Sequence, residues 1–289
     1  MAPELHLDTS ALVYRAFFSL PKTLTDPEGR PINAVRGFLE MVTRLTLDRR
    51  PSRIIAAFDD DWRPAYRVEA YAGYKADRPE DPPELPRQFH VLREVLDAVG
   101  MPVAIAKGLE ADDVLATLAA GASGKDRYLV VTGDRDLVAL VRDPQVAVVF
   151  PVRGLSEVAV FDEAAVIEKY GIPAGLYQDF ATMRGDPSDG LPGVAGIGPV
   201  RAAKLLNEFG SLDGILGNLD SLPPKQKEAF ESARDYLEAM KTVVPMVVDA
   251  KIEMSEAHEP DRELIEELVE VHGLGSSPVR LAQALSGER

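Results

Sequence analysis

The sequence contains no cysteine, so neither a disulfide framework nor a thiolate metal site is possible. It also offers no apolar run long enough to cross a membrane, since the short apolar stretch at residues 243–248 is interrupted by Pro245. The first four residues have neither the basic flank nor the apolar run of a signal peptide. These absences predict a cytoplasmic protein without a membrane partner.

Positive charge is also scarce, because 32 lysines and arginines face 47 aspartates and glutamates, which gives a net charge of −15. By itself this balance favours an acidic cytosolic enzyme over a nucleic-acid-binding protein. Carboxylates that hold two divalent ions, however, would be offset locally by about four positive charges. The partner therefore depends on where the basic residues lie, and the sequence can be searched for that.

The first half of the chain alternates short apolar runs with amphipathic patterns. Strands are predicted over residues 5–8, 53–59, 102–106, 128–134 and 146–150, and helices over 33–47, over 89–99 and from residue 110. This alternation predicts an α/β fold with a mostly parallel central sheet flanked by helices. After Phe161 the pattern is helical nearly throughout, to Leu285. We expect an α/β core over residues 1–161 and a helical region over 162–289 that packs on it as one catalytic unit.

Carboxylates gather at the predicted strand ends. Three strands stop at Asp8, Asp59 and Asp134, and ligands of open parallel sheets bind beyond the carboxyl ends of the strands. The other acids expected at this rim begin a helix, follow a strand or come from the helical region: Glu110, Asp112, Asp113, Asp136, Asp186 and Asp189. Alone, Asp8 or Asp134 is better explained as a helix cap, and Glu110 as a partner of a helix dipole.

Together, these nine carboxylates predict a metal site. We identify no matching lysines or arginines for them, so their charges would repel one another unless cations bind or some pKa values rise. No His or Cys belongs to the set, and donors that are oxygens alone favour Mg²⁺ or Mn²⁺ over Zn²⁺. An array of this size suits two or more ions that flank a phosphodiester.

A glycine-rich corner follows the last two acids. It contains Gly193, Gly196, Ile197 and Gly198, and a helical pattern with Arg201 and Lys204 begins directly after it. Glycines let the backbone turn tightly, and N–H groups near a helix N-terminus bind phosphate. A plain turn between two helices is the alternative for the Gly-Ile-Gly alone. The neighbouring acids and the basic helix face favour a site that binds a nucleic-acid backbone.

These motifs resemble the bacterial 5′-nuclease family, which comprises flap endonucleases and the 5′–3′ exonuclease domain of DNA polymerase I. The likeness spans nearly the whole chain, in family order, and no polymerase follows, so the free-standing form or an excised domain is expected. It rests on Asp8, on residues 58–59, on Tyr74-Lys75-Ala76-Asp77-Arg78, on residues 110–113, on residues 132–136 and on residues 185–198.

The resemblance implies a role for each motif. A first metal site would use Asp8, Asp59, Glu110 and Asp112, and a second would use Asp136, Asp186 and Asp189, with Asp134 between the sites and Asp113 as a further contributor to the second. Residues 62–86 would belong to a helical arch through which a single-stranded 5′ end passes. There Lys75 and Arg78 would contact the scissile phosphate and Tyr74 could stack on a base. Further phosphate contacts would come from Arg15 and Arg67.

The resemblance also implies binding partners and an activity. The corner, over residues 190–208, is similar to the family's helix–three-turn–helix motif, which grips duplex backbone and often holds K⁺. The expected activity is two-metal-ion hydrolysis of DNA phosphodiesters at 5′ flaps and at nicked or gapped duplex in replication and repair. RNA primers are a further substrate class, and a monomer is expected. Thr9 and Gly190 depart from the family pattern, in which many relatives have glycine and asparagine at these positions. Neither change removes a carboxylate, and Gly190 would loosen the turn that aims Asp189 at the second metal site.

Two other functions stay open at this point. A ribonuclease could use a similar acid-lined sheet, although such small enzymes need no duplex-gripping corner. A non-catalytic junction-binding protein could keep the fold after losing its metal ligands, although none of the acids is missing. Without the acids, Lys75 and Arg78 would equally well be two solvated loop charges.

Overall fold

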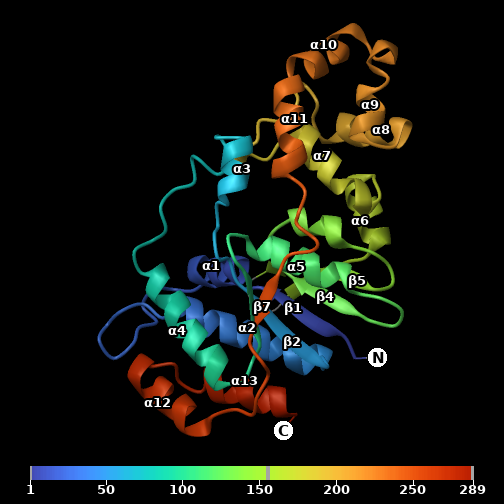
Figure 1. Ribbon diagram of the computed structural model, residues 1–289. Helices are drawn as coiled ribbons and strands as arrows, with labels where there is room; N and C mark the ends of the chain where they lie inside the picture. Colours follow the sequence, from blue (N-terminus) through green and yellow to red (C-terminus); the bar gives the residue numbers. More distant parts are fainter. Residues whose placement is uncertain (1, 154–156, 288–289) are drawn as a thin grey trace.

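The computed structural model describes residues 2–153 and 157–287 of the chain. A seven-stranded sheet lies in the middle of the molecule (Figure 1), with the strand order β6-β5-β4-β1-β2-β3-β7. The strands are β1 (Glu4–Asp8), β2 (Arg53–Ala57), β3 (Val103–Ala106), β4 (Tyr128–Val131), β5 (Val146–Arg153), β6 (Glu157–Phe161) and β7 (Ile252–Met254). The five inner strands are parallel, and the edge strands β6 and β7 are antiparallel to their neighbours. The predicted α/β class with a mostly parallel sheet is confirmed.

The inner strands are apolar along their length because helices cover both faces of the sheet. Alternate residues point to opposite faces, so Ile54 and Ile55 belong to different hydrophobic clusters, as do Val130 and Val131. One face packs on helices α1 (Thr9–Ser19), α2 (Asn33–Arg49), α4 (Leu85–Ala98), α12 (Arg262–His272) and α13 (Ser277–Ser286). The other face packs on α5 (Ala111–Ala120), on the 3-10 helix η1 (Asp136–Leu140) and on α6 (Glu163–Tyr170).

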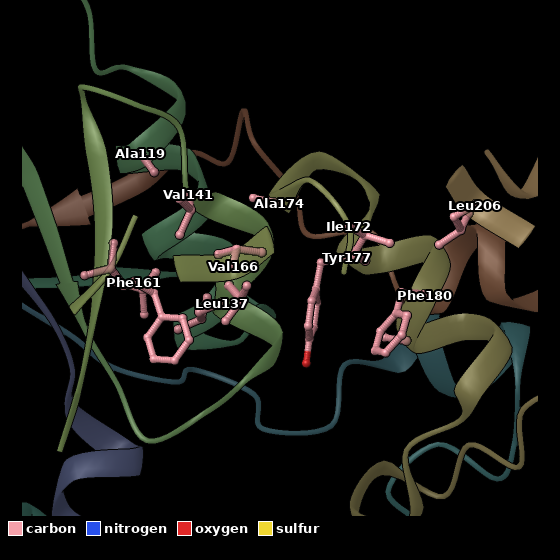
Figure 2. Packing of buried hydrophobic residues seen from close by; sticks show 14 of the residues in the cluster. Ala119, Leu137, Val141, Phe161, Val166, Ile172, Ala174, Tyr177, Phe180 and Leu206 are labelled. Carbon is pink, nitrogen blue, oxygen red and sulfur yellow. The ribbon is translucent and has the colours of Figure 1, made fainter. Parts of the chain in front are cut away.

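The hydrophobic cluster on the face covered by α5, η1 and α6 continues from the sheet into the helical half of the chain. Figure 2 shows Phe161 and Leu137 near the sheet, and Tyr177, Phe180 and Leu206 farther along the same cluster. The helices reached in this way are α7 (Tyr177–Arg184) and α8 (Pro199–Phe209), followed by α9 (Leu212–Leu216), α10 (Pro224–Ser232) and α11 (Arg234–Val243). Short 3-10 helices lie at Ala174–Leu176, Pro187–Asp189 and Leu219–Ser221. A shared core therefore joins the two halves.

The helical half differs from the prediction in one respect. Residues 162–285 are not helical throughout, because β7 pairs with β3 at the sheet edge. The helices α8–α11 gather at one end of the molecule, whereas α12 and α13 lie at the opposite end against α4 and α2 (Figure 1). A strand of three residues carries too little periodicity to be distinguished from a loop by pattern alone. The short strand β6 was likewise not predicted.

The segment expected to form an arch contains one short helix, α3 (Ala65–Ala70). Turns follow it, and α4 begins at Leu85, four residues earlier than predicted. Helix α3 packs against α11 of the helical half (Figure 1), and the rings of Tyr71 and Tyr236 meet edge to face with centroids 6.0 Å apart. The base of this segment is therefore anchored by contacts between distant parts of the chain.

No helix among the described residues is both long and apolar enough to span a bilayer.

Candidate active site

The site lies where the strand order changes direction. From β1 the chain proceeds outward to β2 and β3, and then returns to place β4 on the other side of β1. Ligands of open α/β sheets bind at the carboxyl ends of two such strands. Asp8 ends β1, and its Oδ2 accepts a hydrogen bond from Thr132 Oγ1, directly after β4, at 2.6 Å. The same threonine oxygen accepts from the backbone N–H of Asp134 at 2.8 Å.

Asp8 also caps helix α1. Its Oδ1 accepts from the backbone N–H of Ala11 at 3.0 Å, which is the ordinary role of an aspartate at that position. Burial raises the pKa of Asp8 to about 7, and the charges of Asp59 and Asp134 add to the effect. Asp8 therefore caps α1 and also lies near the other acids of the rim.

Asp59 joins two helix ends at the same rim. One carboxylate oxygen accepts from the backbone N–H of Ala111, at the start of α5, at 2.8 Å. The other accepts from Ser10 Oγ, in the first turn of α1, at 2.5 Å. The hydroxyls of Ser10 and Thr132 were not among the predicted site residues. Their nearness in sequence to Asp8 and Asp134 is the signal that could have identified them.

The start of α5 forms a capping box. The Glu110 carboxylate accepts from the backbone of Asp113, and the Asp113 carboxylate accepts from the backbone N–H of Glu110. Both acids are buried, and Arg67 of α3 forms ion pairs with both. Asp113 Oδ1 also accepts from the backbone N–H of Val247 at 2.8 Å. The carboxylate of Asp113 thus has partners at the start of its own helix and in two other segments.

The remaining acids influence one another electrostatically. Burial raises the pKa of Asp112 well above its ordinary value, and the charges of Asp134 and Asp8 raise it further. Burial also raises the pKa of Asp134, and the charge of Asp189 contributes to this shift. Burial raises the pKa of Asp136 to about 8, with Asp134 as the strongest of its charged neighbours. Carboxylates from both halves of the chain therefore share one region.

Asp186 and Asp189 reach this region from the connection between α7 and α8. The backbone of Asp186 pairs with that of Leu191, which closes a turn over residues 186–191. Asp186 Oδ1 caps the 3-10 helix by accepting from the backbone N–H of Ser188 at 2.9 Å. The turn presents both carboxylates toward the acids at the strand ends.

The expectation of acids without matching cations is wrong for four of the nine acids, namely Glu110, Asp113, Asp186 and Asp189. Lys75 donates to Glu110, Arg78 donates to Asp189 Oδ1 at 2.8 Å, and Arg184 lies 3.3 Å from Asp186 Oδ2. Arg67, Lys75 and Arg78 come from a segment far in sequence from the acids that they contact, so the residues around each acid did not reveal them. Arg184, in contrast, lies only two residues before Asp186. Burial lowers the pKa of Lys75, which is 6% exposed.

A pocket of about 40 Å³ opens onto this network. Its acidic wall consists of Glu110, Asp112, Asp136, Asp186 and Asp189. Its apolar wall includes Leu191, from the turn over residues 186–191, and Val243, Val244 and Met246, from the end of α11 and the residues after it. Contributions from both halves of the chain therefore meet in one cavity.

The residues expected to contact DNA are distributed differently. Arg67 and Tyr74 are buried, and the Tyr74 hydroxyl donates to Glu110 at 2.7 Å, so neither side chain is displayed at the surface. Arg15 is half-buried on α1. In the corner before α8, Ile197 is buried while Gly196 and Gly198 are exposed. Lys204 is exposed on α8, and Arg201 Nη1 donates to the Gly196 carbonyl at 2.6 Å, which braces the corner.

The donor chemistry of the site suits a hard divalent cation. The acidic donors are oxygens, several with raised pKa values, and Asp136 Oδ1 is buried without a hydrogen-bond partner. Within residues 2–153 and 157–287, however, no three Asp, Glu or His side chains are arranged as a ready coordination shell. Glu110, Asp186 and Asp189 form ion pairs with lysine and arginine side chains instead.

Family models match most of the chain. Residues 4–171 match the N-terminal resolvase-like domain of 5′-3′ exonucleases, and residues 172–263 match the C-terminal SAM fold of the same enzymes. The chain belongs to the 5′-3′ exonuclease family. It is thus a nuclease, as the motifs predicted, and the resemblance is confirmed.

Curated members of the 5′-3′ exonuclease family resemble the chain over nearly its full length. A 5′-3′ exonuclease of Streptomyces coelicolor is 43% identical and covers 97% of this chain and 99% of its own. One from Mycobacterium tuberculosis is 39% identical, with 98% of each chain covered. DNA polymerase I of Mycobacterium leprae is 45% identical over 78% of this chain, which corresponds to 25% of the polymerase.

Solved structures share the exonuclease fold at lower identity. The bacteriophage T5 flap endonuclease, in a complex with DNA and metal ions, matches with a TM-score of 0.68 at 17% identity, with 98% of each chain covered. Flap endonuclease-1 from Methanococcus jannaschii matches with a TM-score of 0.65 at 19% identity, with 99% of this chain and 93% of the other covered.

Proposed function

We propose that the chain is a structure-selective 5′ nuclease that hydrolyses DNA phosphodiesters at 5′ flaps and at the 5′ ends of nicked or gapped duplex. The observation that carries this proposal is one pocket to which the sheet and the helical half both contribute acids. Lys75 and Arg78 form ion pairs with two of these acids, Glu110 and Asp189. One phosphate group of a substrate could therefore contact both the cations and the oxygen donors.

The proposed metal ligands are those that the family resemblance implies. Asp8, Asp59, Glu110 and Asp112 would hold one Mg²⁺ or Mn²⁺ ion, and Asp136, Asp186 and Asp189 would hold another, with Asp134 between the two. When bound, such ions would supply an activated water and stabilise the leaving oxygen. We leave Asp113 out of the set, because its oxygens already accept from Arg67, Glu110 and Val247.

The basic side chains would have to change partners when the substrate binds. Lys75 and Arg78 neutralise Glu110 and Asp189 in the ligand-free protein. Once divalent cations supply that positive charge, both side chains are free to donate charge-assisted hydrogen bonds to the scissile phosphate. Such donors stabilise the negative charge that grows on the phosphate during attack.

The glycine corner and α8 would bind the duplex by its backbone as a helix–three-turn–helix over residues 190–208, with K⁺ held at the corner. Backbone contacts select the shape of DNA and not its base sequence. We further propose a monomer in the cytoplasm that acts in replication and repair and also removes RNA primers. The catalytic unit would comprise a core over residues 1–161 and a helical region over residues 162–289.

Cleavage of a labelled 5′-flap substrate tests the proposal directly. Wild-type protein with Mg²⁺ should cut near the flap junction, and Asp134→Ala should lose activity by a factor on the order of 10³ or more. Asp97→Ala is the matched control, because Asp97 is exposed on α4, away from the acids, and this variant should cut normally. Equal cutting by Asp134→Ala would refute the assigned roles, and EDTA-resistant binding without cutting would indicate a non-catalytic DNA-binding protein.

A further inference from the structure

Arg184 lies beside one of the acids assigned to the second metal site. It is the last residue of helix α7, and its Nη2 atom is 3.3 Å from Asp186 Oδ2. Its side chain is 19% exposed. Asp186 lines the pocket described above, whereas Arg184 does not. Arg184 therefore contacts the acid without forming part of the wall that a substrate would meet.

Two further contacts hold the guanidinium of Arg184 in place. Its Nε donates to the carbonyl of Gly185 at 3.0 Å, and its Cζ atom lies 5.6 Å from the centroid of the Phe180 ring, a distance at which a cation is attracted to an aromatic face. The cation on the neighbouring acid, Arg78 on Asp189, is 37% exposed and belongs to the segment between α3 and α4. A divalent ion can therefore displace Arg78 more easily than Arg184.

The charge of Arg184 also acts on Asp136, a second proposed ligand of the same ion. Burial raises the pKa of Asp136, and Arg184 is a positive charge that opposes this rise. Asp136 Oδ1 is buried and has no hydrogen-bond partner among the described residues, and Asp136 lines the pocket together with Asp186. A divalent cation held by these two acids would therefore be repelled by Arg184 at both of them.

The direction of the Asp186 side chain is set by other contacts. The backbone of Asp186 exchanges two hydrogen bonds with that of Leu191, each of 2.8 Å. Asp186 Oδ1 accepts from the backbone N–H of Ser188 at 2.9 Å and from Ser188 Oγ at 2.5 Å. The contact of Oδ2 with Arg184 is longer, at 3.3 Å. Because Ser188 and Leu191 already aim the carboxylate, the main contribution of Arg184 is its charge.

We propose that Arg184 sets the affinity of the second metal site, because its fixed positive charge opposes the binding of a divalent cation to Asp136 and Asp186. The inference rests on the proposed function, in which these two acids and Asp189 bind one of the ions. Before an ion binds, the same charge reduces the repulsion between the two acids. Arg184 thus acts through the ligands and contacts neither the ion nor the substrate itself.

Binding of Mn²⁺ to the full chain, without DNA and at a fixed pH, tests this role. Isothermal titration calorimetry on wild type and Arg184→Met gives the number of ions and their affinities. Methionine keeps an unbranched side chain against Phe180 but carries no charge. We expect one class of Mn²⁺ site to bind about 10-fold more tightly in Arg184→Met, since one nearby positive charge is removed, and the other class to stay unchanged. The class that tightens should be missing in Asp186→Asn.

Two further variants separate the charge of Arg184 from its bulk and from the net charge of the protein. Arg184→Lys keeps a positive charge at the same helix end, so it should tighten the site much less than Arg184→Met does. Arg135→Met is the matched control, because Arg135 stands between Asp134 and Asp136 in sequence but is exposed and forms no ion pair within the described part of the chain. Solvent and salt screen such a charge, so Mn²⁺ affinity should change by less than about twofold. Should Arg184→Met fail to fold, Arg184→Gln serves instead.

The outcomes distinguish this inference from the proposed function. Unchanged or weaker Mn²⁺ binding in Arg184→Met, or an equal gain in Arg184→Lys or Arg135→Met, would overturn the role of Arg184. If wild type also cuts flaps, the proposed function then stands without it. A wild type that binds Mn²⁺ but cuts no flap refutes the proposed function, and the titrations still test Arg184. If neither wild type nor Arg184→Met binds Mn²⁺, both proposals fail.

Discussion

Arg67 and Asp113 form a buried ion pair, with Nη2 of the guanidinium 2.7 Å from Oδ1 of the carboxylate. The same guanidinium bonds Glu110 and lies 3.4 Å from the Pro245 carbonyl. Helix α3, the start of α5 and the segment that leads to β7 are thereby joined through one side chain. Arg67 is only 3% exposed, so its charge neutralises the buried carboxylates of Glu110 and Asp113 and is not displayed to solvent.

Replacing Arg67 should therefore destabilise the fold. Arg67→Met removes the charge but keeps much of the side-chain bulk, and it leaves Asp113 buried without its cation, which typically costs about 3–5 kcal/mol. Arg78→Met is the control, since Arg78 is 37% exposed and its ion pair should contribute less than about 1 kcal/mol. Denaturant unfolding measures both changes. Equal stability of the two variants would contradict the structural role of Arg67.

The stability of the metal-free protein should fall as pH rises. Burial raises the pKa of Asp8 to about 7 and that of Asp136 to about 8, from an ordinary value of 3.8. Between pH 3.8 and about 7–8 the folded protein therefore binds more protons than the unfolded chain. The contribution of these two groups to the free energy of unfolding is full below pH 3.8 and is lost as pH rises through about 7–8.

Thermal unfolding in EDTA between pH 5.5 and pH 8.5 measures this dependence. Asp136→Asn cannot ionise, so its unfolding temperature should fall less steeply with pH than that of wild type. Adding Mg²⁺ at pH 8 should raise the unfolding temperature of wild type more than that of the variant. Parallel profiles for the two proteins would show that Asp136 is not protonated in the folded state.

Lys75 and Lys204 should affect different kinetic constants. Lys75→Met removes a donor to the phosphate in the transition state, so kcat should fall by about 10²- to 10³-fold. Folding should persist, because Arg67 and Tyr74 still bond Glu110. Single-turnover cleavage measures the effect. A Lys75→Met variant that changes only KM would instead assign this lysine to substrate binding alone.

Lys204 should contribute to affinity through the duplex backbone. Lys204→Ala removes one exposed positive charge from α8, so binding should weaken for all sequences alike. The slope of log K against log salt should become shallower by about 0.9 for one lost phosphate contact. Lys251→Ala, at an exposed position just before β7, is the control and should leave the slope unchanged. Identical slopes for both variants would exclude α8 from the DNA-binding surface.

The sequence allowed correct predictions where an acidic residue stands at the end of an apolar run or at the start of a helical pattern. Asp8, Asp59 and Asp134 stand at the ends of apolar runs. Because β1 pairs in parallel with both β2 and β4, the carboxyl ends of these three strands lie side by side. Glu110 was predicted to open a helix, and it is the N-cap of α5. Such features depend on periodicity over a few residues, which the sequence displays directly.

The missed features depend on partners that are distant in sequence. Arg67 contacts Asp113 across 46 residues, and Lys75 contacts Asp189 across more than 100, so neither pairing leaves a local signal. Tyr14 donates to Asp81 across 67 residues, which holds the middle of the 71–84 segment on α1. Strand β7 escaped for the same reason, since its three residues become a strand only through pairing with β3.

Anomalous diffraction from crystals soaked in Mn²⁺ tests most directly whether acids from both halves of the chain hold cations together. We predict two peaks on the rim, one among Asp8, Asp59 and Asp112 and one among Asp134, Asp136 and Asp189, with Lys75 moved off Glu110. An absence of peaks at this rim, or peaks bound by other residues, would contradict the two-metal account.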